Sequence, residues 1–295
     1  MGVLRVNGYS ADHAASIPRV RRFRLNWRHL ILHALLIMGA LIMMLPFLWM
    51  VSTSLKDASE VLTTSPTFWP RAWRWDNYTK VFTLVPFARF YLNTIIVTCG
   101  RVTGQLIFAS MAAYAFARLS FRGRNFIFIM ILAVMMIPGQ VTLVPNYILM
   151  KYLGWLDSYK GLIIPGLFSA FGTFLLRQFF LTIPQDLVDA AVLDGCNPFQ
   201  VYYRIALPLA RSALVAFGLI VALWSWNDFL WPLIITNKTQ MQMISVGLAY
   251  FRGQYVSSVS VMMAAATVAT IPMVVLFMFV QRQLIEGITM TGLHG

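Results

Sequence analysis

The residues best suited to specific chemistry lie in one polar segment, residues 186–209, which reads DLVDAAVLDGCNPFQVYYRIALPL. This segment is charged and helix-forming, and strongly apolar stretches flank it on both sides. Its paired alanines keep one surface thin, so another protein can approach the backbone closely. The chemistry that this pattern indicates is therefore the docking of a partner protein rather than catalysis.

Local signals predict the structure of the first half of this segment. Pro184 favours the start of a helix, and the acidic first turn that follows suits the positive end of the helix dipole. Val188, Ala191 and Val192 stand three and four residues apart, which predicts a single apolar stripe. Gly195 permits the left-handed backbone conformation that commonly ends a helix.

The second half is predicted to form a new element that starts at Asn197-Pro198. Phe199, Tyr202 and Tyr203 would give this element an apolar face of its own. Leu207-Pro208-Leu209 then leads the chain back into an apolar stretch. We therefore expect a short helix that lies across one end of the molecule and exposes one of its ends.

A second chemically unusual residue is Arg101, which falls near the middle of the apolar stretch 90–117. In a membrane-spanning helix, a central arginine costs about 3 kcal/mol by insertion scales unless it faces a cavity or a partner. Two interpretations stay open: Arg101 lines a path and attracts an acidic substrate, or it makes a structural hydrogen bond to a neighbouring span or subunit. Gly100 and Gly104 beside it let another helix approach closely.

Other polar and aromatic side chains are weaker candidates for contact with a substrate. Each of them is equally suited to packing or to an interface. They are Tyr91, Asn93, Gln105, Tyr114, Trp224 and Asn227.

Several classes of chemistry find no support in the sequence. It contains no phosphate-binding loop, no H-E-x-x-H zinc motif and no G-x-S-x-G nucleophile motif. The four histidines lie near the two ends of the chain, and the two cysteines, Cys99 and Cys196, lie far apart, so we expect no metal site and no disulfide. The net charge of +13 comes without a separate basic domain, which argues against nucleic acid as a partner.

The composition defines the elements that must position these residues. The chain of 295 residues is 59% hydrophobic and 11% charged, with a mean hydropathy of +0.71, whereas soluble domains carry about 25% charged residues. The predicted fold class is an all-α polytopic membrane protein. A spanning helix needs about 20 mostly apolar residues. Six segments qualify: Leu30–Val51, Phe90–Ala117, Phe126–Met150, Gly161–Phe180, Ala213–Ile235 and Val259–Val280.

Arginine positions predict which ends face the cytoplasm. Arginines crowd the first 29 residues and the short turn 118–125, which share one face if the six spans alternate. The positive-inside rule makes that face cytoplasmic. The first apolar stretch is too long for a cleavable signal and is expected to remain as a helix. The predicted organisation is a cytoplasmic segment 1–29, a six-helix domain 30–285, a cytoplasmic loop 181–212, periplasmic loops 52–89, 151–160 and 236–258, and a cytoplasmic tail 286–295.

The polar segment resembles the EAA loop in permease subunits of bacterial ATP-binding-cassette importers, with the pattern EAA, then G, then LPL. Asp189-Ala190-Ala191 takes the place of EAA, Asp194-Gly195 that of the DG, and Leu207-Pro208-Leu209 that of LPL. The runs Ala112–Arg124 and Trp226–Ile234 and the tail QRQLIEGITMTGLHG resemble the maltose-type second permease of carbohydrate importers. The usual Lys-Gly ending is His294-Gly295 here, and Ser212 stands where the family often has proline.

This resemblance implies a type I importer permease fold and a coupling role for the loop. The residues that would dock on the ATPase are Asp189, Ala190, Ala191, Asp194 and Gly195. The implied partners are a second homologous permease, two ATP-binding subunits, a periplasmic or lipid-anchored solute-binding protein and membrane lipid. ATP and Mg would bind to the ATPase chains, with no cofactor on this chain and no enzymatic activity of its own.

The implied function is uptake of a carbohydrate across the bacterial inner membrane. If Arg101 lines the path, a uronate-containing oligosaccharide is the favoured substrate. A first alternative is a permease for glycerol-phosphate-type esters, which shares this subfamily. A second alternative, of a different class, is an ion-coupled secondary carrier that works alone.

Overall fold

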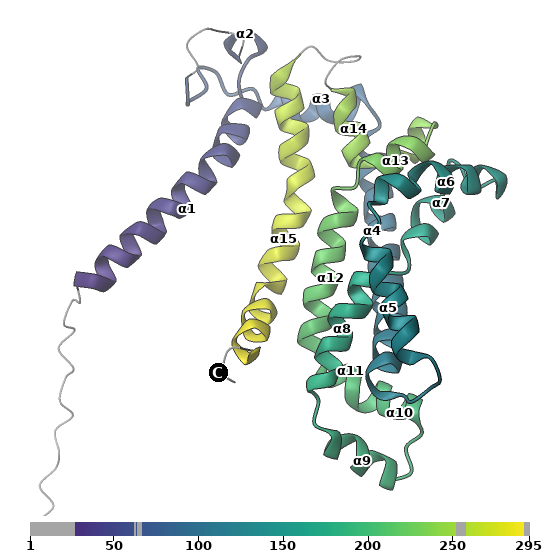
Figure 1. Cartoon of the computed structure of the whole chain (residues 1–295). Helices are drawn as coiled ribbons and strands as arrows, with labels where there is room; N and C mark the ends of the chain where they lie inside the picture. Colours follow the sequence, from purple (N-terminus) through teal and green to yellow (C-terminus); the bar gives the residue numbers. More distant parts are fainter. Residues whose placement is uncertain (1–26, 62, 64–66, 252–257, 292–295) are drawn as a thin grey trace, which may run out of the picture. The chain divides into compact units, whose positions relative to one another are not determined.

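The computed structural model describes residues 27–61, 63, 67–251 and 258–291, with side chains through Gln281. Most of the predicted segment 1–29, the end of the loop 236–258 and the end of the tail 286–295 lie outside the described residues. All regular elements of the described part are helices (Figure 1). They are α1 (Trp27–Ser54), α2 (Ala58–Val61), α3 (Asp76–Leu84), α4 (Phe87–Arg118), α5 (Arg124–Met135), α6 (Gly139–Tyr152), α7 (Tyr159–Ile163), η1 (Ile164–Gly166), α8 (Ala170–Thr182), α9 (Gln185–Leu193), α10 (Pro198–Val201), η2 (Tyr202–Ala206), α11 (Leu207–Leu209), α12 (Arg211–Trp226), α13 (Leu230–Ile235), η3 (Thr239–Met241), α14 (Ile244–Tyr250) and α15 (Val259–Thr291).

The chain divides into two compact units, residues 1–46 and 47–295. In the first unit, every described residue from Trp27 to Pro46 is exposed, although most of these side chains are apolar. Such a helix needs lipid or other helices around it. The second unit contains all the other elements and both candidate sites.

Three of the six predicted spans are single helices of sufficient length and hydropathy. They are α1, α4 and the part of α15 from Val259 to Gln281. Their bounds contain the predicted segments Leu30–Val51, Phe90–Ala117 and Val259–Val280. The remaining three spans arise only if pairs of helices joined by a sharp bend each count as one.

The predicted segment Phe126–Met150 is wrong as a single helix. It consists of α5 and α6, whose axes differ by 97°. Pro138 stands at the break, where its ring removes a backbone donor and disfavours helical geometry at Ile137. The predicted segment Gly161–Phe180 also contains a bend, of 43°, between α7–η1 and α8.

The predicted segment Ala213–Ile235 is wrong at its C-terminal end. Helix α12 ends at Trp226, and Leu230–Ile235 form the separate helix α13. The polar residues Asn227 and Asp228 interrupt the run, and Asn227 donates its side-chain amide to the carbonyl of Leu223 at 2.8 Å. The sharp bend next to α12 lies at its N-terminal end, where the helical stretch 198–209 meets α12 at an angle of 78°.

Helix α4 runs parallel to the α7–α8 segment, because four hydrogen bonds between them join residues at a nearly constant separation in the sequence. Arg101 donates to Leu162, Gln105 to Gly166, Arg177 to Phe116 and Arg118 to Phe180, at sequence separations of 61, 61, 61 and 62 residues. Both helices therefore point the same way through the bundle. In consequence, the basic turn after α4 and the polar segment after α8 lie at the same end.

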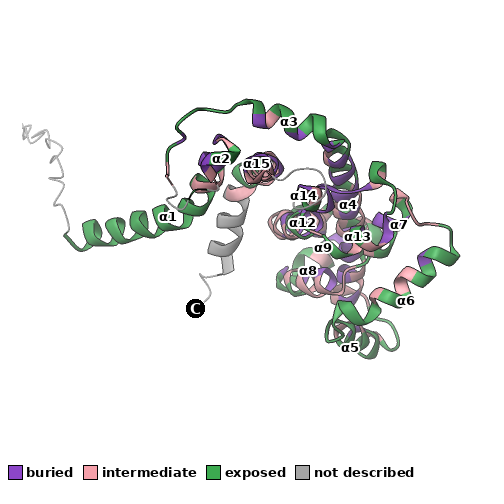
Figure 2. Ribbon diagram, turned by 90° about the horizontal axis from the view of Figure 1, so that it is seen from above, coloured by how far each residue is buried: buried purple, intermediate pink, exposed green. Residues whose placement is uncertain are grey.

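Small residues allow this close packing, as the pair Gly100 and Gly104 predicted. A Cβ atom added at Gly104 would lie 2.3 Å from Leu167 Cδ2, and one at Gly100 would lie 2.9 Å from Ile163 Cδ1. Figure 2 shows buried residues gathered on α4, α12 and α14, whereas α5 and α6 are largely exposed.

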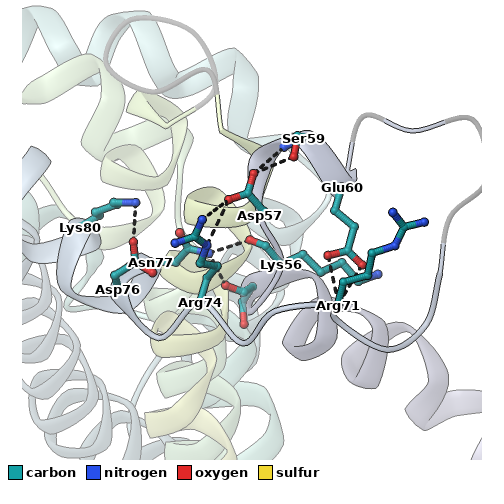
Figure 3. Close-up of polar contacts among 10 residues, drawn as sticks. Lys56, Asp57, Ser59, Glu60, Arg71, Arg74, Asp76, Asn77 and Lys80 are labelled. Carbon is teal, nitrogen blue, oxygen red and sulfur yellow. Dashed lines mark hydrogen bonds and ion pairs between the residues drawn. The ribbon is translucent and has the colours of Figure 1, made fainter.

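The segment between α1 and α4 folds onto the end of α1 (Figure 3). Buried Asn77 donates to the backbone carbonyls of Ser54 and Lys56 at 2.9 and 3.0 Å. The Lys56 side chain is only 3% exposed, lies 4.6 Å over the ring of Trp49 and donates to the carbonyl of Thr67. A segment predicted as a loop therefore has a fixed structure of its own.

Carboxylates on the surface of this segment are held by nearby donors (Figure 3). Asp57 accepts hydrogen bonds from the backbone and hydroxyl of Ser59 and pairs with Arg74 at 2.9 Å. The Ser59 bonds, followed by Arg74, lower the pKa of Asp57. Asp76 pairs with Lys80 one turn along α3 at 2.7 Å, and this hydrogen bond lowers the pKa of Asp76.

Candidate functional site

The predicted docking helix exists as α9 and exposes most of the residues assigned to it. Asp189, Ala190, Asp194 and Gly195 are all exposed. Ala191 is different, because it is only 5% exposed and packs into the hydrophobic cluster beneath the helix. Ala191 therefore anchors α9, as its place in the predicted apolar stripe indicates, and its part in docking stays a prediction.

The helix signals were correct at both ends of α9, but the predicted apolar stripe was only partly correct. Pro184 precedes the helix, and Gly195 adopts the left-handed conformation with φ of 84°. Val188 packs toward the core, whereas Val192 is 57% exposed. Leu193, at the last turn, is 88% exposed. The exposed end of α9 is thus an apolar tip with acidic residues around it.

The element after α9 starts at Pro198 as predicted, with Asn197 and Gln200 forming a reciprocal capping box. Its predicted apolar face is split between the two sides. Phe199 and Tyr203 are 63% and 65% exposed, but Tyr202 is 7% exposed and bonds through its hydroxyl to Ser110 on α4 at 2.8 Å. Tyr202 also begins a short π-helix, a local widening that often occurs at functional positions.

Arg101 is buried, at 8% exposure, and its charge is matched within this chain. Its Nη1 atom lies 2.7 Å from Asp228 Oδ2, and its Nε atom donates to the carbonyl of Leu162 at 2.9 Å. This geometry matches the structural interpretation of Arg101, with a neighbouring segment as its partner. Sequence reasoning missed Asp228, although an acidic residue in an apolar stretch is a usable signal for such a pair.

Two further path candidates have their polar atoms engaged inside the protein. Asn93 is fully buried, donates to the carbonyls of Gln240 and Gln242 and accepts from Tyr159. Gln105 donates to the carbonyl of Gly166 at 2.6 Å, while its side-chain oxygen is buried without a partner. Both residues hold helices together.

The aromatic candidates do not gather at one site. Tyr91 meets Trp226 edge to face at 5.7 Å, whereas Tyr114 lies at the other end of α4 against Phe180. Trp224 is 58% exposed and rests against Phe171. Each of these three aromatic side chains therefore has its ring contacts with residues outside the predicted path set.

A cavity of about 460 Å³ lies where α12 ends, and Asn227 is the one predicted path residue in its lining. Polar side chains that the sequence analysis missed, Ser245 and Thr270, also line it. Hydroxyl groups in apolar helices give no distinctive sequence signal. Among the described residues, no cluster of three or more His, Cys, Asp or Glu could hold a metal ion.

A helical bundle with apolar outer faces, three to six candidate spans and a polar helix at one end defines a multi-pass membrane protein. The family described as "Binding-protein-dependent transport system inner membrane component" matches residues 105–289. The chain belongs to this family.

Individual relatives match nearly the whole chain. The arabinooligosaccharides transport system permease protein AraQ of Halalkalibacterium halodurans is 33% identical over 87% of this chain and 93% of that protein. The sn-glycerol-3-phosphate transport system permease protein UgpE of Brucella suis is 32% identical over 89% and 96%. A solved chain from a bacterial ABC transporter for import of the acidic polysaccharide alginate has a TM-score of 0.75 and 26% identity, covering 86% of this chain and 95% of that chain.

Proposed function

We propose that this chain is a permease subunit of an ATP-driven carbohydrate importer in a bacterial inner membrane, and that α9 is its coupling helix. The observation that carries the proposal is the exposed, glycine-ended α9, with acidic Asp189 and Asp194 beside the apolar tip at Leu193. Desolvation of such a tip in a partner's cleft is the usual source of binding energy at an interface. The ATP would be bound and hydrolysed by separate ATPase subunits.

The relatives support an oligosaccharide as the substrate class. AraQ is a permease for arabinooligosaccharides, and the solved neighbour imports an acidic polysaccharide. UgpE, at nearly the same identity, supports the glycerol-phosphate ester as the second candidate substrate. Arg101 gives no separate support for an acidic substrate, since Asp228 already neutralises its charge.

The proposed partners follow from the same family membership. A second permease would complete the path, two ATPase subunits would bind below α9 and its counterpart, and a solute-binding protein would deliver the substrate. The described residues of segment 52–89 form the surface that we assign to the side facing this binding protein. The segment's backbone and paired charges give that surface a fixed shape.

The test is transport by the complete complex, in which this chain is co-expressed with its partner permease, ATPase and solute-binding protein and placed in proteoliposomes. We expect ATP-dependent accumulation of a labelled oligosaccharide, with no accumulation when the ATPase is inactivated. Neutral oligosaccharides, uronate-containing oligosaccharides and glycerol-3-phosphate are compared at equal concentration. Transport that persists without ATP hydrolysis would instead identify an ion-coupled carrier.

A further inference from the structure

We propose that Arg118 is the positioning residue that makes the coupling helix move with α4, through a relay from Arg118 to Gln185 to Asp189. This inference rests on the proposed function of α9. Arg118 is the last residue of α4, and its guanidinium group is half-buried against the stretch where α8 ends and α9 begins.

One guanidinium group binds three successive points of that stretch. Its Nε and Nη2 atoms donate to the carbonyl of Phe180 at 3.1 and 2.7 Å, and Nη2 also donates to the carbonyl of Ile183. Its Nη1 atom donates to Gln185 Oε1 at 2.6 Å. Carbonyls at the C-terminal end of a helix lack partners within the helix, and the helix dipole makes that end negative. Both effects favour a cation at this position.

The relay then reaches the acidic residue of the docking helix. Gln185 Nε2 donates to Asp189 Oδ1 at 2.9 Å, one turn further along α9. The amide orientation is fixed by chemistry, because a guanidinium can only donate and a carboxylate can only accept. Asp189 is therefore oriented by Arg118 through Gln185, while its other oxygen stays available to a partner.

The chain that follows α9 also contacts α4. Tyr202 bonds to Ser110, and Tyr114 lies between Tyr202 and Phe180, with ring centroids 5.3 and 5.8 Å away. Both sides of the polar segment are thus fixed to the last turns of α4. Without Arg118, the side that leads into α9 would keep only its apolar contacts.

The chain supplies its own probes for the resulting rigid-body motion. It has two cysteines, Cys99 on α4 and Cys196 directly after α9. Spin labels on both, in a complex whose other subunits lack cysteine, report the distance between α4 and α9. If α4 and α9 move as one body, this distance is the same with and without bound nucleotide in the native complex.

The variants are Arg118→Ala, Arg118→Lys and Gln185→Ala, with Arg122→Ala as the matched control, since Arg122 is exposed on the same turn and makes no bond with any described residue. We expect Arg118→Ala to keep the ATPase subunits bound and hydrolysing ATP, but to lower transport per ATP roughly tenfold, within the usual range of coupling between sites. The Cys99–Cys196 distance would then change with nucleotide. Lysine should restore part of the effect, because it keeps the charge but lacks the planar fork.

The outcomes separate this inference from the proposed function. If the native complex does not transport with ATP, the proposed function is wrong. If the native complex transports and Arg118→Ala matches Arg122→Ala in both readouts, the relay is wrong. If Arg118→Ala fails to assemble, Gln185→Ala decides, since it keeps both carbonyl bonds: unchanged transport per ATP in that variant overturns the proposal.

Discussion

Removal of Asp228 should destabilise the bundle more than removal of its partner Arg101. Arg101 stands 14 residues from Phe87 and 17 from Arg118, the ends of α4, which places it about 21 and 26 Å from them at 1.5 Å per residue. Neither end is within reach of its side chain. In Asp228→Leu the guanidinium keeps only the carbonyl of Leu162. An unpaired central arginine costs about 2.5–3.5 kcal/mol, so we expect Asp228→Leu to lower the free energy of unfolding by about 2–3 kcal/mol.

The reverse change, Arg101→Met, should cost less. It leaves Asp228, whose side chain is 23% exposed and therefore keeps more contact with solvent than the Arg101 side chain, which is 10% exposed. The double variant Arg101→Met/Asp228→Leu should lie within about 1 kcal/mol of the native protein, because an apolar pair often replaces a buried ion pair without loss.

The assay is reversible unfolding of the purified chain in mixed micelles, with helix content followed by circular dichroism. An interaction between Arg101 and Asp228 is confirmed if the losses of unfolding free energy in the two single variants sum to about 2 kcal/mol more than the loss in the double variant. Losses that add within about 0.5 kcal/mol would refute the reasoning. Transport by the double variant also tests the substrate hypothesis: selective loss of uronate transport would return Arg101 to the path.

Three further changes test other parts of the structure. Gly195→Ala places a side chain at φ of 84° with no atom within 4 Å, so backbone strain alone should cost about 1 kcal/mol and raise hydrogen exchange in α9. Gly172→Ala would bring a Cβ to 2.1 Å from the Phe217 ring and should cost about 1–3 kcal/mol in the micelle unfolding assay. Asp57, whose pKa is lowered chiefly by the backbone N–H of Ser59, contributes stability above its unfolded pKa that is lost as the pH falls through its folded pKa. Hydrogen exchange of this loop, corrected for intrinsic rates, should therefore rise on acidification in the native protein and show less pH dependence in Asp57→Asn.

Local signals in the sequence were sufficient for the single helices and for the shape of α9. A left-handed turn at Gly195 and a helix start after Pro184 depend only on neighbouring residues, and both are present. The inward position of Arg101 was also predictable, since a charged side chain in a membrane span is stable only where it faces the bundle interior or a cavity. The class of protein was predictable from the same patterns.

Features that depend on direction or on distant partners were not predictable. A count of apolar residues cannot distinguish one long helix from two helices, α5 and α6, whose axes differ by 97°, because both arrangements have the same composition. The Arg101–Asp228 pair joins positions 127 residues apart, and no sequence feature near either residue indicates its partner. The burial of Ala191 was open for a related reason: a small residue suits an exposed thin surface and a tight core contact equally well.

The parallel register of α4 with α7–α8 explains why α4 is suited to carry force. Lipid offers no hydrophobic drive for two helices to associate, so close packing at small residues and hydrogen bonds must hold them. Arg101 binds the α7 carbonyl at one level and Arg118 the α8 carbonyls at the other, 17 residues apart along α4. A displacement that enters at Arg118 therefore reaches Arg101 and Asp228 without an intervening hinge in α4. Three of the polar residues predicted to line a substrate path, Arg101, Asn93 and Gln105, thus also join α4 to the segments packed against it.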